Sequence, residues 1–347
     1  MTRIAVIGCG FYAQNHINAW RDLAAEGAEI VAVCDRDETK ARAAGERTGA
    51  PVFLDAGEMI DRVSPDLVDI VTTLPTHRPL VELAAAHGVG TIVQKPLAPT
   101  WQDCLALAET VTQSGIFFGV HENFRFQAPL RRVATLLAAG AIGTPSFARI
   151  SFRTAYDVYR AQPYLRQEPR LIILDLGIHV LDIARLWLGE VADIFARTQT
   201  RGENLAGEDT ATMLLRHHSG AVSVVDCSFA ANRIADVFPQ TLVEIEGPEG
   251  SIVVAEDCQI HVLSRGLRWS EDLRTPLLSW TERPWHVTQE SVLLFNRHVL
   301  RALSNGDRPD THIADNLRTY ALVEAAYASA ASGSAVAPLA WLAGSAS

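Results

Sequence analysis

Short apolar runs alternate with longer mixed segments over the first third of the chain. They are rich in β-branched residues and continuously apolar, which is typical of parallel strands covered by helices on both faces. Regular alternation of such runs with helical segments predicts βαβ units. We therefore expect a doubly wound parallel sheet of the Rossmann type over residues 1–122. The runs are RIAVI at 3–7, EIVAVC at 29–34, LVDIVT at 67–72, TIVQ at 91–94 and IFFGV at 116–120.

The pattern changes after a helical segment at about 127–140, where Gly-Ala-Ile-Gly-Thr-Pro at 140–145 interrupts the chain. Strand-like runs then follow one another with turn residues between them, and two helical segments come last. This order predicts a second domain over residues 123–347, of the α+β class, with a large and mostly antiparallel sheet. The runs are ATMLLRH at 211–217, AVSVVDCSF at 221–229, TLVEIEG at 241–247 and SIVVA at 251–255, and the helices lie at about 286–304 and 312–331.

Composition supports a globular protein that binds a small ligand. Its 347 residues suffice for two cores, and 48% of them are hydrophobic and 20% charged. A formal net charge of −10 without any cluster of Lys and Arg argues against nucleic acid and anionic membranes as partners. No apolar run approaches the length that spans a bilayer.

The cysteines point to a reducing compartment. There are five, an odd number, widely spaced and never in a C-x-x-C pair, so the sequence predicts neither a disulfide framework nor a zinc site. The start of the chain shows no pattern of an export signal. We expect a cytoplasmic protein without a metal.

The first apolar run leads directly into Gly8-Cys9-Gly10-Phe11-Tyr12-Ala13, a G-x-G-x-x-A form of the dinucleotide fingerprint. Gly8 permits the tight turn, and Gly10 lets the backbone approach a pyrophosphate. Ala13 keeps the following helix close to the strand, and the N-terminus of that helix offers N–H groups to the phosphates. We expect Phe11 and Tyr12 in this turn to lie at the cofactor.

Asp35 ends the second run, about 25 residues after Gly10. An acid at this place accepts hydrogen bonds from the ribose hydroxyls and repels a 2′-phosphate, which favours NAD. The neighbouring Arg36 keeps NADP possible, because an arginine here either stacks on adenine or accepts the 2′-phosphate.

Three further motifs follow. Thr73-Leu74-Pro75-Thr76-His77 comes after the third run, Gln94-Lys95-Pro96 after the fourth, and Asp175-Leu176-Gly177-Ile178-His179-Val180-Leu181-Asp182 lies in the second half. With the fingerprint they resemble the Gfo/Idh/MocA oxidoreductases, which include inositol dehydrogenases, and the likeness covers essentially the whole chain. The glycine-rich approach to the last motif is replaced here by Leu-Ile-Ile-Leu at 171–174.

The resemblance implies an NAD(P)-dependent dehydrogenase that acts on CH–OH groups of a sugar or polyol. It implies catalytic roles for Lys95, Asp175 and His179. It also implies cofactor contacts by Thr73, His77, Gln94 and Lys95, and substrate contacts by Lys95, Asp175 and His179. The position of residues 121–125 after a strand of the first sheet suggests Asn123 at the nicotinamide and Glu122 at substrate hydroxyls. Arg153 and Tyr156 are candidates for the wall of a sugar site, because aromatic faces and bidentate polar groups suit polyols.

The residues themselves suit this chemistry. Lys95 follows a parallel strand, where ligands bind in open α/β sheets, and Pro96 stiffens its loop. Asp175, His179 and Asp182 have the spacing of one face of a helix. Histidine titrates near neutral pH, so it suits the removal of a hydroxyl proton, and a nearby carboxylate fixes its tautomer. The segment His-Glu-Asn-Phe-Arg at 121–125 follows the expected sixth strand and so faces the same crevice.

Two enzymatic interpretations and one other remain open. The segments QKPLAP, HENFRFQAP and ILDLGIHVLD resemble the branch of the family that oxidises the anomeric carbon of an aldose such as D-apiose to a lactone. The alternative enzyme oxidises a ring secondary alcohol to a ketone, as inositol dehydrogenases do. The third interpretation is a regulator that binds a dinucleotide without turnover. A sheet with few helices of its own leaves one face to cover, so we expect a homodimer or homotetramer.

Overall fold

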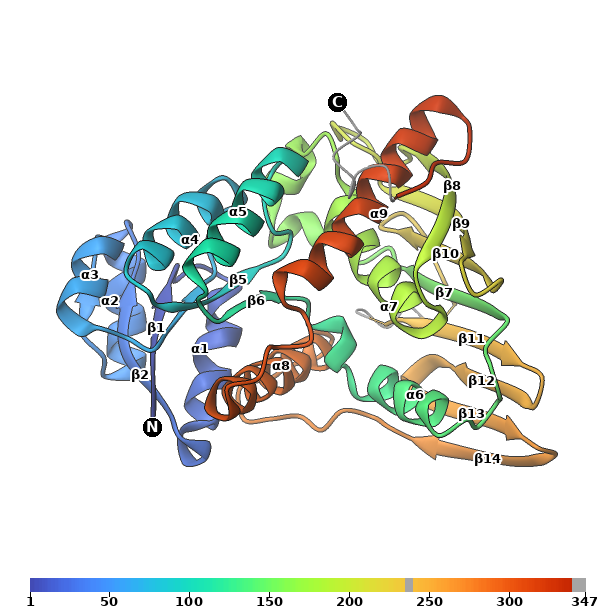
Figure 1. Ribbon diagram of the computed structural model, residues 1–347, viewed down its shortest axis with the longest axis horizontal. Coiled ribbons are helices and arrows are strands. Elements are labelled where there is room, and N and C mark those ends of the chain that lie inside the picture. Colours follow the sequence, from blue (N-terminus) through green and yellow to red (C-terminus); the bar gives the residue numbers. More distant parts are fainter. Residues whose placement is uncertain (235–239, 339–347) are drawn as a thin grey trace. The chain divides into compact units, whose positions relative to one another are not determined.

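The computed structural model describes residues 1–234 and 240–338 (Figure 1). The chain forms two compact units, of which the first contains Met1–Asn123 and Val292–Leu317. The second contains Phe124–Ser291 and the chain from Arg318 onward. The sequence suggests one boundary, after residue 122, whereas in the structure residues 292–317 return to the first unit.

The first unit is built on a parallel sheet with the strand order β3-β2-β1-β4-β5-β6. The order reverses between β1 and β4, and ligands bind at the carboxyl ends of the strands at such a reversal. Its strands are β1 (Thr2–Ile7), β2 (Ala28–Cys34), β3 (Val52–Phe53), β4 (Leu67–Ile70), β5 (Gly90–Gln94) and β6 (Phe118–His121).

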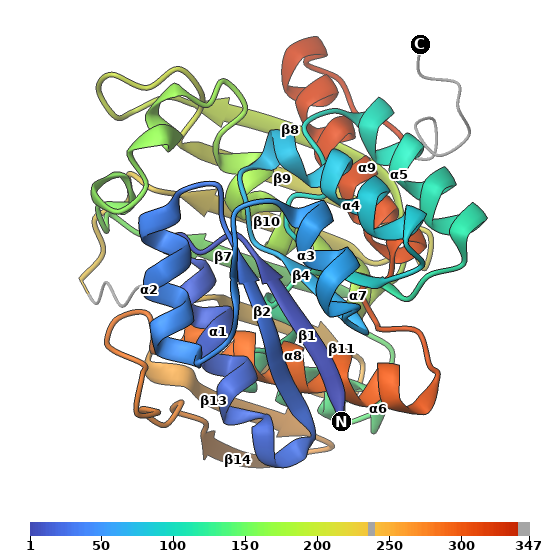
Figure 2. The same ribbon diagram turned by 90° about the vertical axis from the view of Figure 1, so that its left-hand side faces the viewer.

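Helices cover both faces of this sheet (Figure 2). Helices α1 and α2 contact each other on one face, and α3, α4 and α5 form a row on the other. Side chains of Asp37, Asp55 and Thr100 accept hydrogen bonds from first-turn N–H groups and so fix where three of these helices begin. The helices are α1 (Ala13–Asp22), α2 (Glu38–Thr48), α3 (Ala56–Val63), α4 (His77–Ala86) and α5 (Trp101–Ser114).

The returning segment packs against β6. Helix α8 (His286–Asn305) places Phe295 against the ring of His121, with ring centroids 4.2 Å apart. The Thr311 hydroxyl donates to the Val120 carbonyl over 2.6 Å, and the Val120 N–H donates to the Thr311 carbonyl. The edge strand β6 is therefore covered by residues that lie far from it in the sequence.

The second unit is built on a sheet with the order β14-β13-β12-β11-β7-β10-β9-β8, in which β7 and β10 are the only parallel pair among the described strands. Its strands are β7 (Phe147–Arg153), β8 (Val191–Gln199), β9 (Thr210–His217), β10 (Val222–Ser228), β11 (Leu242–Gly247), β12 (Gly250–Val254), β13 (Gln259–Ser264) and β14 (Leu267–Asp272).

One face of this sheet carries the helices of the unit (Figure 1). Helix α7 (Ile178–Leu188) packs on β7 and β10, and α6 (Ala128–Ala138) on β12. Helix α9 (Ile313–Ser332) is joined to β8 by a hydrogen bond from the Ala196 N–H to Ser329 Oγ. Buried and more exposed residues alternate along β7, as expected for a sheet with one covered face.

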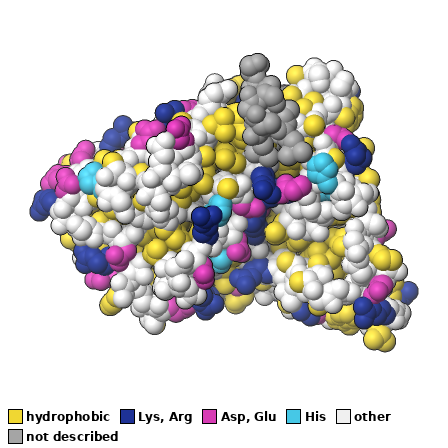
Figure 3. Space-filling model, viewed as in Figure 1, with side chains coloured by type: hydrophobic (Ala, Val, Ile, Leu, Met, Phe, Trp, Pro, Cys, Tyr) yellow, Lys and Arg dark blue, Asp and Glu magenta, His cyan; other side chains and the backbone are white. Residues whose placement is uncertain are grey.

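The predicted fold class is confirmed in both halves. Strands β3, β7, β8, β13 and β14 were not among the predicted runs. In the described part of the chain, no helix is long and apolar enough to cross a membrane. On the surface shown in Figure 3, Lys and Arg side chains are interspersed with Asp and Glu.

Candidate active site

The turn after β1 has the geometry that a dinucleotide needs. Gly8 has a φ of +95°, and a Cβ there would lie 2.3 Å from the Val71 carbonyl oxygen, so only glycine fits. A Cβ at Gly10 would meet no protein atom within 4 Å, so its missing side chain leaves open space beside the turn. This is the space that a pyrophosphate occupies in such folds.

The ends of α1 and β2 complete this pattern. The first turn of α1 has no acidic residue, and the side chain of the N-cap residue Tyr12 forms no capping hydrogen bond. The N-terminus of this helix therefore suits an anion. The Asp35 carboxylate accepts hydrogen bonds from the N–H groups of Cys9 and Asp37, each over 2.8 Å. These bonds hold the carboxylate at the end of β2 and leave oxygen lone pairs for ribose hydroxyls. The turn and Asp35 therefore fit NAD, and Arg36 is exposed beside them.

Two buried side chains hold the loop that carries Lys95. The Gln94 Oε1 accepts a hydrogen bond from the Lys95 N–H over 2.8 Å. The His77 Nδ1 lies 3.1 Å from the Pro96 carbonyl oxygen and 3.3 Å from that of Leu97. Burial lowers the pKa of His77 despite these carbonyls. Gln94 and His77, which the resemblance assigns to the cofactor, thus also shape the Lys95 loop.

The other expected cofactor residues differ in exposure. Phe11 in the turn is 59% exposed, and Thr73 after β4 is also exposed. Tyr12 is half-buried, with its ring 5.6 Å from that of His16. Glu122 and Asn123 are buried directly after β6.

In the second unit, the Asp-x-Gly-x-His motif begins in a π-helix, Ile173–Gly177, that continues directly into α7. The motif therefore does not lie in one regular α-helix, because a wider turn with more residues per turn holds Asp175 and leads to His179. The apolar stretch at 171–174 leads into this turn. Single π turns inside helices are frequent at functional sites.

His179 is buried and lies flat on Phe124, with ring centroids 3.9 Å apart and ring planes 5° apart. Asp175 is half-buried, in the π-helix one turn before it. Loss of hydration and then the negative charge of Asp175 raise the pKa of the Tyr164 phenol. The ring of Tyr156 meets that of Trp285 edge to face at 5.7 Å. Aromatic faces of this kind suit a sugar.

Asp182 has a different role from the other acids of the motif. It is fully buried and forms a two-point ion pair with Arg125, whose Nη2 is 2.7 Å from Oδ1, and it accepts a hydrogen bond from Thr319. Burial acts to raise the pKa of Asp182, but the charges of Arg125 and Arg185 outweigh it, and the pKa lies below its usual value. Asp182 and Arg125 therefore stabilise the unit.

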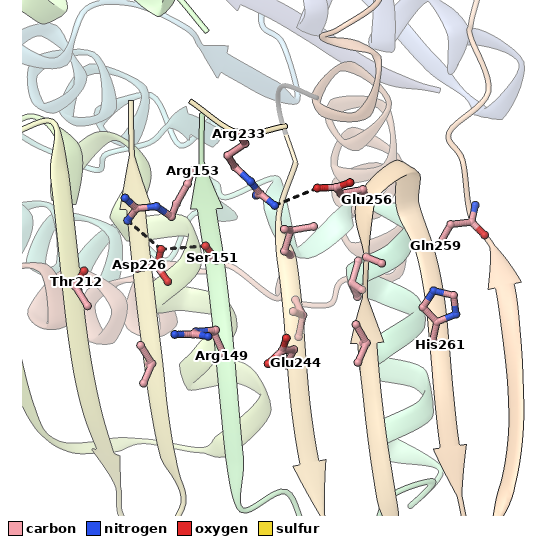
Figure 4. A pocket seen from close by; sticks show the side chains of 16 residues that line it. Arg149, Ser151, Arg153, Thr212, Asp226, Arg233, Glu244, Glu256, Gln259 and His261 are labelled. Atoms are coloured by element: carbon pink, nitrogen blue, oxygen red, sulfur yellow. Dashed lines mark hydrogen bonds and ion pairs between the residues drawn. The ribbon is translucent and has the colours of Figure 1, made fainter. Parts of the chain in front are cut away.

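Arg153 lies on the sheet face opposite His179. Phe152 packs toward Phe124 on the helix-covered face, with ring centroids 5.9 Å apart, and successive strand residues point to opposite faces. Arg153 pairs with Asp226 over 3.2 Å on the open face, which holds a hollow of about 840 Å³ (Figure 4). The structure thus does not bring Arg153 together with Asp175 and His179.

Two features of the candidate site could not be predicted from the sequence. Phe124 stands inside the motif of residues 121–125, but nothing in the sequence reveals its contact with His179. His16 and Asp69 lie on α1 and β4 and form a buried pair that also reaches Gln94. The one sequence feature that could have indicated this pair is the acid Asp69 within a continuously apolar run. Among the described residues, no group of three or more His, Cys, Asp or Glu side chains could hold a metal ion.

Comparison with known proteins shows the family of this chain. Residues 2–122 match the model of the oxidoreductase family with an NAD-binding Rossmann fold, and residues 130–253 match the GFO/IDH/MocA C-terminal domain. The protein is therefore an NAD-binding oxidoreductase. The chain belongs to the GFO/IDH/MocA family.

The relatives differ in their similarity. D-apiose dehydrogenase of Paraburkholderia graminis is 47% identical over 96% of this chain and 88% of its own length. Inositol 2-dehydrogenase 3 of Saccharopolyspora erythraea is 31% identical over 82% of this chain and 85% of its own length. A solved structure of an oxidoreductase from Agrobacterium radiobacter, in complex with NAD+, L-tartaric acid and magnesium, has a TM-score of 0.95 and 45% identity, and the match covers 98% of this chain and 99% of that one.

Proposed function

We propose that this protein is an NAD-dependent dehydrogenase of a free aldose, and that it oxidises the anomeric carbon of D-apiose or a closely similar sugar to a lactone. The observation that carries the proposal is the 47% identity with a D-apiose dehydrogenase over nearly the whole chain. The held Asp35 carboxylate and the open space at Gly10 support NAD as the cofactor.

Bound NAD supplies the hydride acceptor. The anomeric carbon loses a hydride and its hydroxyl loses a proton, so aldose and NAD⁺ give lactone, NADH and one proton. In the proposal, His179 accepts the hydroxyl proton, and Lys95 donates a hydrogen bond to the same oxygen or exchanges its proton. Asp175 orients the imidazole and stabilises its protonated form. Glu122 and Tyr156 contact other hydroxyls, whereas Arg153 has no substrate role.

The second candidate is oxidation of a ring secondary alcohol to a ketone, which the 31% identity with an inositol dehydrogenase supports. The two products differ chemically, because a lactone hydrolyses to an acid and a ketone does not. A regulator without turnover would require no catalytic set, and the presence of Lys95, Asp175 and His179 argues against it.

A panel of free pentoses, hexoses and inositols with NAD and NADP tests the function. We expect reduced cofactor to form fastest with D-apiose and NAD, followed by slow release of acid from the product. Preference for an inositol, with one proton per NADH and no carboxylic acid formed afterwards, would establish the second candidate. Absence of reduction with every sugar would favour the regulator.

We further infer a homodimer or homotetramer that buries the open face of the second unit's sheet. Leu214 on this face is 49% exposed, and Val224 and Val253 line its hollow among charged side chains (Figure 4). Oligomer interfaces combine apolar and paired polar groups in this way. Light scattering at micromolar concentration should give twice or four times the chain mass, and a monomer would refute the assembly. We also expect the protein to act in the cytoplasm.

A further inference from the structure

A continuous line of hydrogen bonds in the first unit runs from the middle of β4 to the peptide of Lys95. It begins at Asp69, whose side chain is fully buried and accepts hydrogen bonds from Trp20 Nε1 over 2.7 Å and from His16 Nδ1 over 2.9 Å. The other ring nitrogen of His16, Nε2, lies 3.2 Å from Gln94 Nε2. Gln94 Oε1 in turn accepts from the Lys95 N–H.

The hydrogen bond from Lys95 to Gln94 determines which group donates and which accepts in the bonds between Gln94, His16 and Asp69. A peptide N–H can only donate, so the Lys95 N–H must face the oxygen of the Gln94 amide. The amide nitrogen then faces His16 and donates to Nε2, which must be unprotonated. His16 is therefore the neutral tautomer with its proton on Nδ1, and it donates this proton to Asp69. Such a line of bonds strengthens its members mutually.

We propose that Asp69, His16 and Gln94 are positioning residues that hold the Lys95 peptide, and that a neutral amide at position 94 is required for the tautomer of His16. The proposal rests on the catalytic role of Lys95 in the proposed function. None of the three residues needs to touch substrate or cofactor for this purpose. Their effect is to hold the base of the Lys95 side chain in one place, and small displacements at an active site cost much of the rate.

Gln94→Glu reverses one bond of the line. A carboxylate still accepts from the Lys95 N–H but cannot donate to His16, so His16 must take a second proton or lose the contact. An imidazolium here would lie between Asp69 and the new carboxylate. It would face the ring of His121, whose centroid is 4.2 Å away, and that of Tyr12 at 5.6 Å. Gln102→Glu, at an exposed position in the first turn of α5, is the matched control.

Kinetics of the full-length enzyme with NAD and D-apiose test the positioning role. His16→Asn keeps a donor toward Asp69 but lacks the acceptor for Gln94, so kcat should fall about 10–100-fold while the KM for NAD changes little. His16→Gln places an oxygen near the former Nε2 and should recover much of this loss. In a Lys95→Ala background, His16→Asn should reduce kcat by less than about twofold, because its effect passes through Lys95. Gln102→Glu should match the wild type.

The inference is overturned if His16→Asn keeps the wild-type kcat, or if its loss is equally large in the Lys95→Ala background. Wild-type turnover by Lys95→Ala alone would instead contradict the proposed function. In either case, ¹⁵N NMR of histidine-labelled holoenzyme examines the line itself, with the His16 signal identified by its loss in His16→Asn. We expect the Nδ1–H tautomer in the wild type and a proton on Nε2 in Gln94→Glu. An Nε2–H tautomer in the wild type would overturn the inference directly.

Discussion

Phe124 lies flat against His179, with ring centroids 3.9 Å and ring planes 5° apart. The two residues come from the segment after β6 and from α7, 55 positions apart in the chain. A parallel stack of this kind buries one face of the imidazole and fixes its plane. The nitrogens of the ring therefore keep one orientation, which a proton acceptor needs.

Phe124→Leu should lower kcat about tenfold, because a leucine fills the space but leaves the imidazole plane free to rotate. Phe126→Leu is the matched control, since Phe126 is equally buried two residues later and packs near Arg131. Both variants should lose about 1 kcal/mol of stability. Steady-state kinetics and urea unfolding measure the two effects. Equal activity of the two variants would show that the stack has no catalytic effect.

The two glycines of the turn should respond differently to alanine. Gly8→Ala should destabilise the protein, because its Cβ would lie 2.3 Å from the Val71 carbonyl oxygen at a φ of +95°. Gly10→Ala should keep the melting temperature and weaken NAD binding at least about tenfold, because its Cβ points into open space beside the turn. Scanning calorimetry measures the melting temperature of each variant, and titration calorimetry measures its affinity for NAD. Unchanged NAD affinity in Gly10→Ala would move the pyrophosphate away from this turn.

In the proposed function Asp35 accepts hydrogen bonds from the ribose hydroxyls and repels a 2′-phosphate, so Asp35→Ala should weaken NAD binding and relax discrimination against NADP. The loss of its bonds to Cys9 and Asp37 adds to the first effect. The measurement is kcat/KM for both cofactors at one pH and ionic strength. A wild-type preference for NADP would contradict this account and make Arg36 a phosphate ligand.

The ion pair of Asp182 and Arg125 should make the free energy of unfolding depend on pH in the acidic range. The pKa of Asp182 is lowered in the folded protein, so its contribution is complete above the pKa of an unfolded aspartate, about 4, and is lost as the pH falls through the lower folded value. Asp182→Asn should cost about 3–5 kcal/mol at pH 7, because it leaves Arg125 buried without its counter-charge.

Urea unfolding at pH 7 and at progressively lower pH checks this. The gap between wild type and Asp182→Asn should narrow below about pH 4. Asp193→Asn, which breaks the more exposed pair with Arg216, should cost less than about 1 kcal/mol. A gap that stays constant on acidification would show that the pair does not titrate as described.

The sequence predicted the parts of the fold whose periodicity is local. Continuous apolar runs identified most strands of the parallel sheet, and the helices α6, α8 and α9 lie within a few residues of the expected segments. Strand β3 has only two residues, Val52 and Phe53, and gives no periodic signal. The return of residues 292–317 to β6 depends on tertiary contacts such as Phe295 with His121, which local patterns do not contain.

In the candidate site, too, local patterns were predictable from the sequence and tertiary contacts were not. Gly8, Gly10 and Asp35 follow from backbone geometry at strand ends, so they could be located from the fingerprint. Asp182 shares the motif of His179 but pairs with Arg125 and accepts a hydrogen bond from Thr319, and neither partner is local in the sequence. The face on which Arg153 lies follows from the register of β7, a strand that the sequence did not reveal.

The central claim is that Lys95 and His179 carry out NAD-dependent oxidation of an aldose. Its most direct test is the turnover of D-apiose with saturating NAD by the wild type, Lys95→Ala and His179→Ala, with NAD affinity measured in parallel. Loss of a general acid or base should lower kcat by about 10²–10⁴-fold in each variant and leave NAD affinity nearly intact. Near wild-type turnover by both variants would contradict the account and assign the proton transfer to other residues, such as His121 or Glu122.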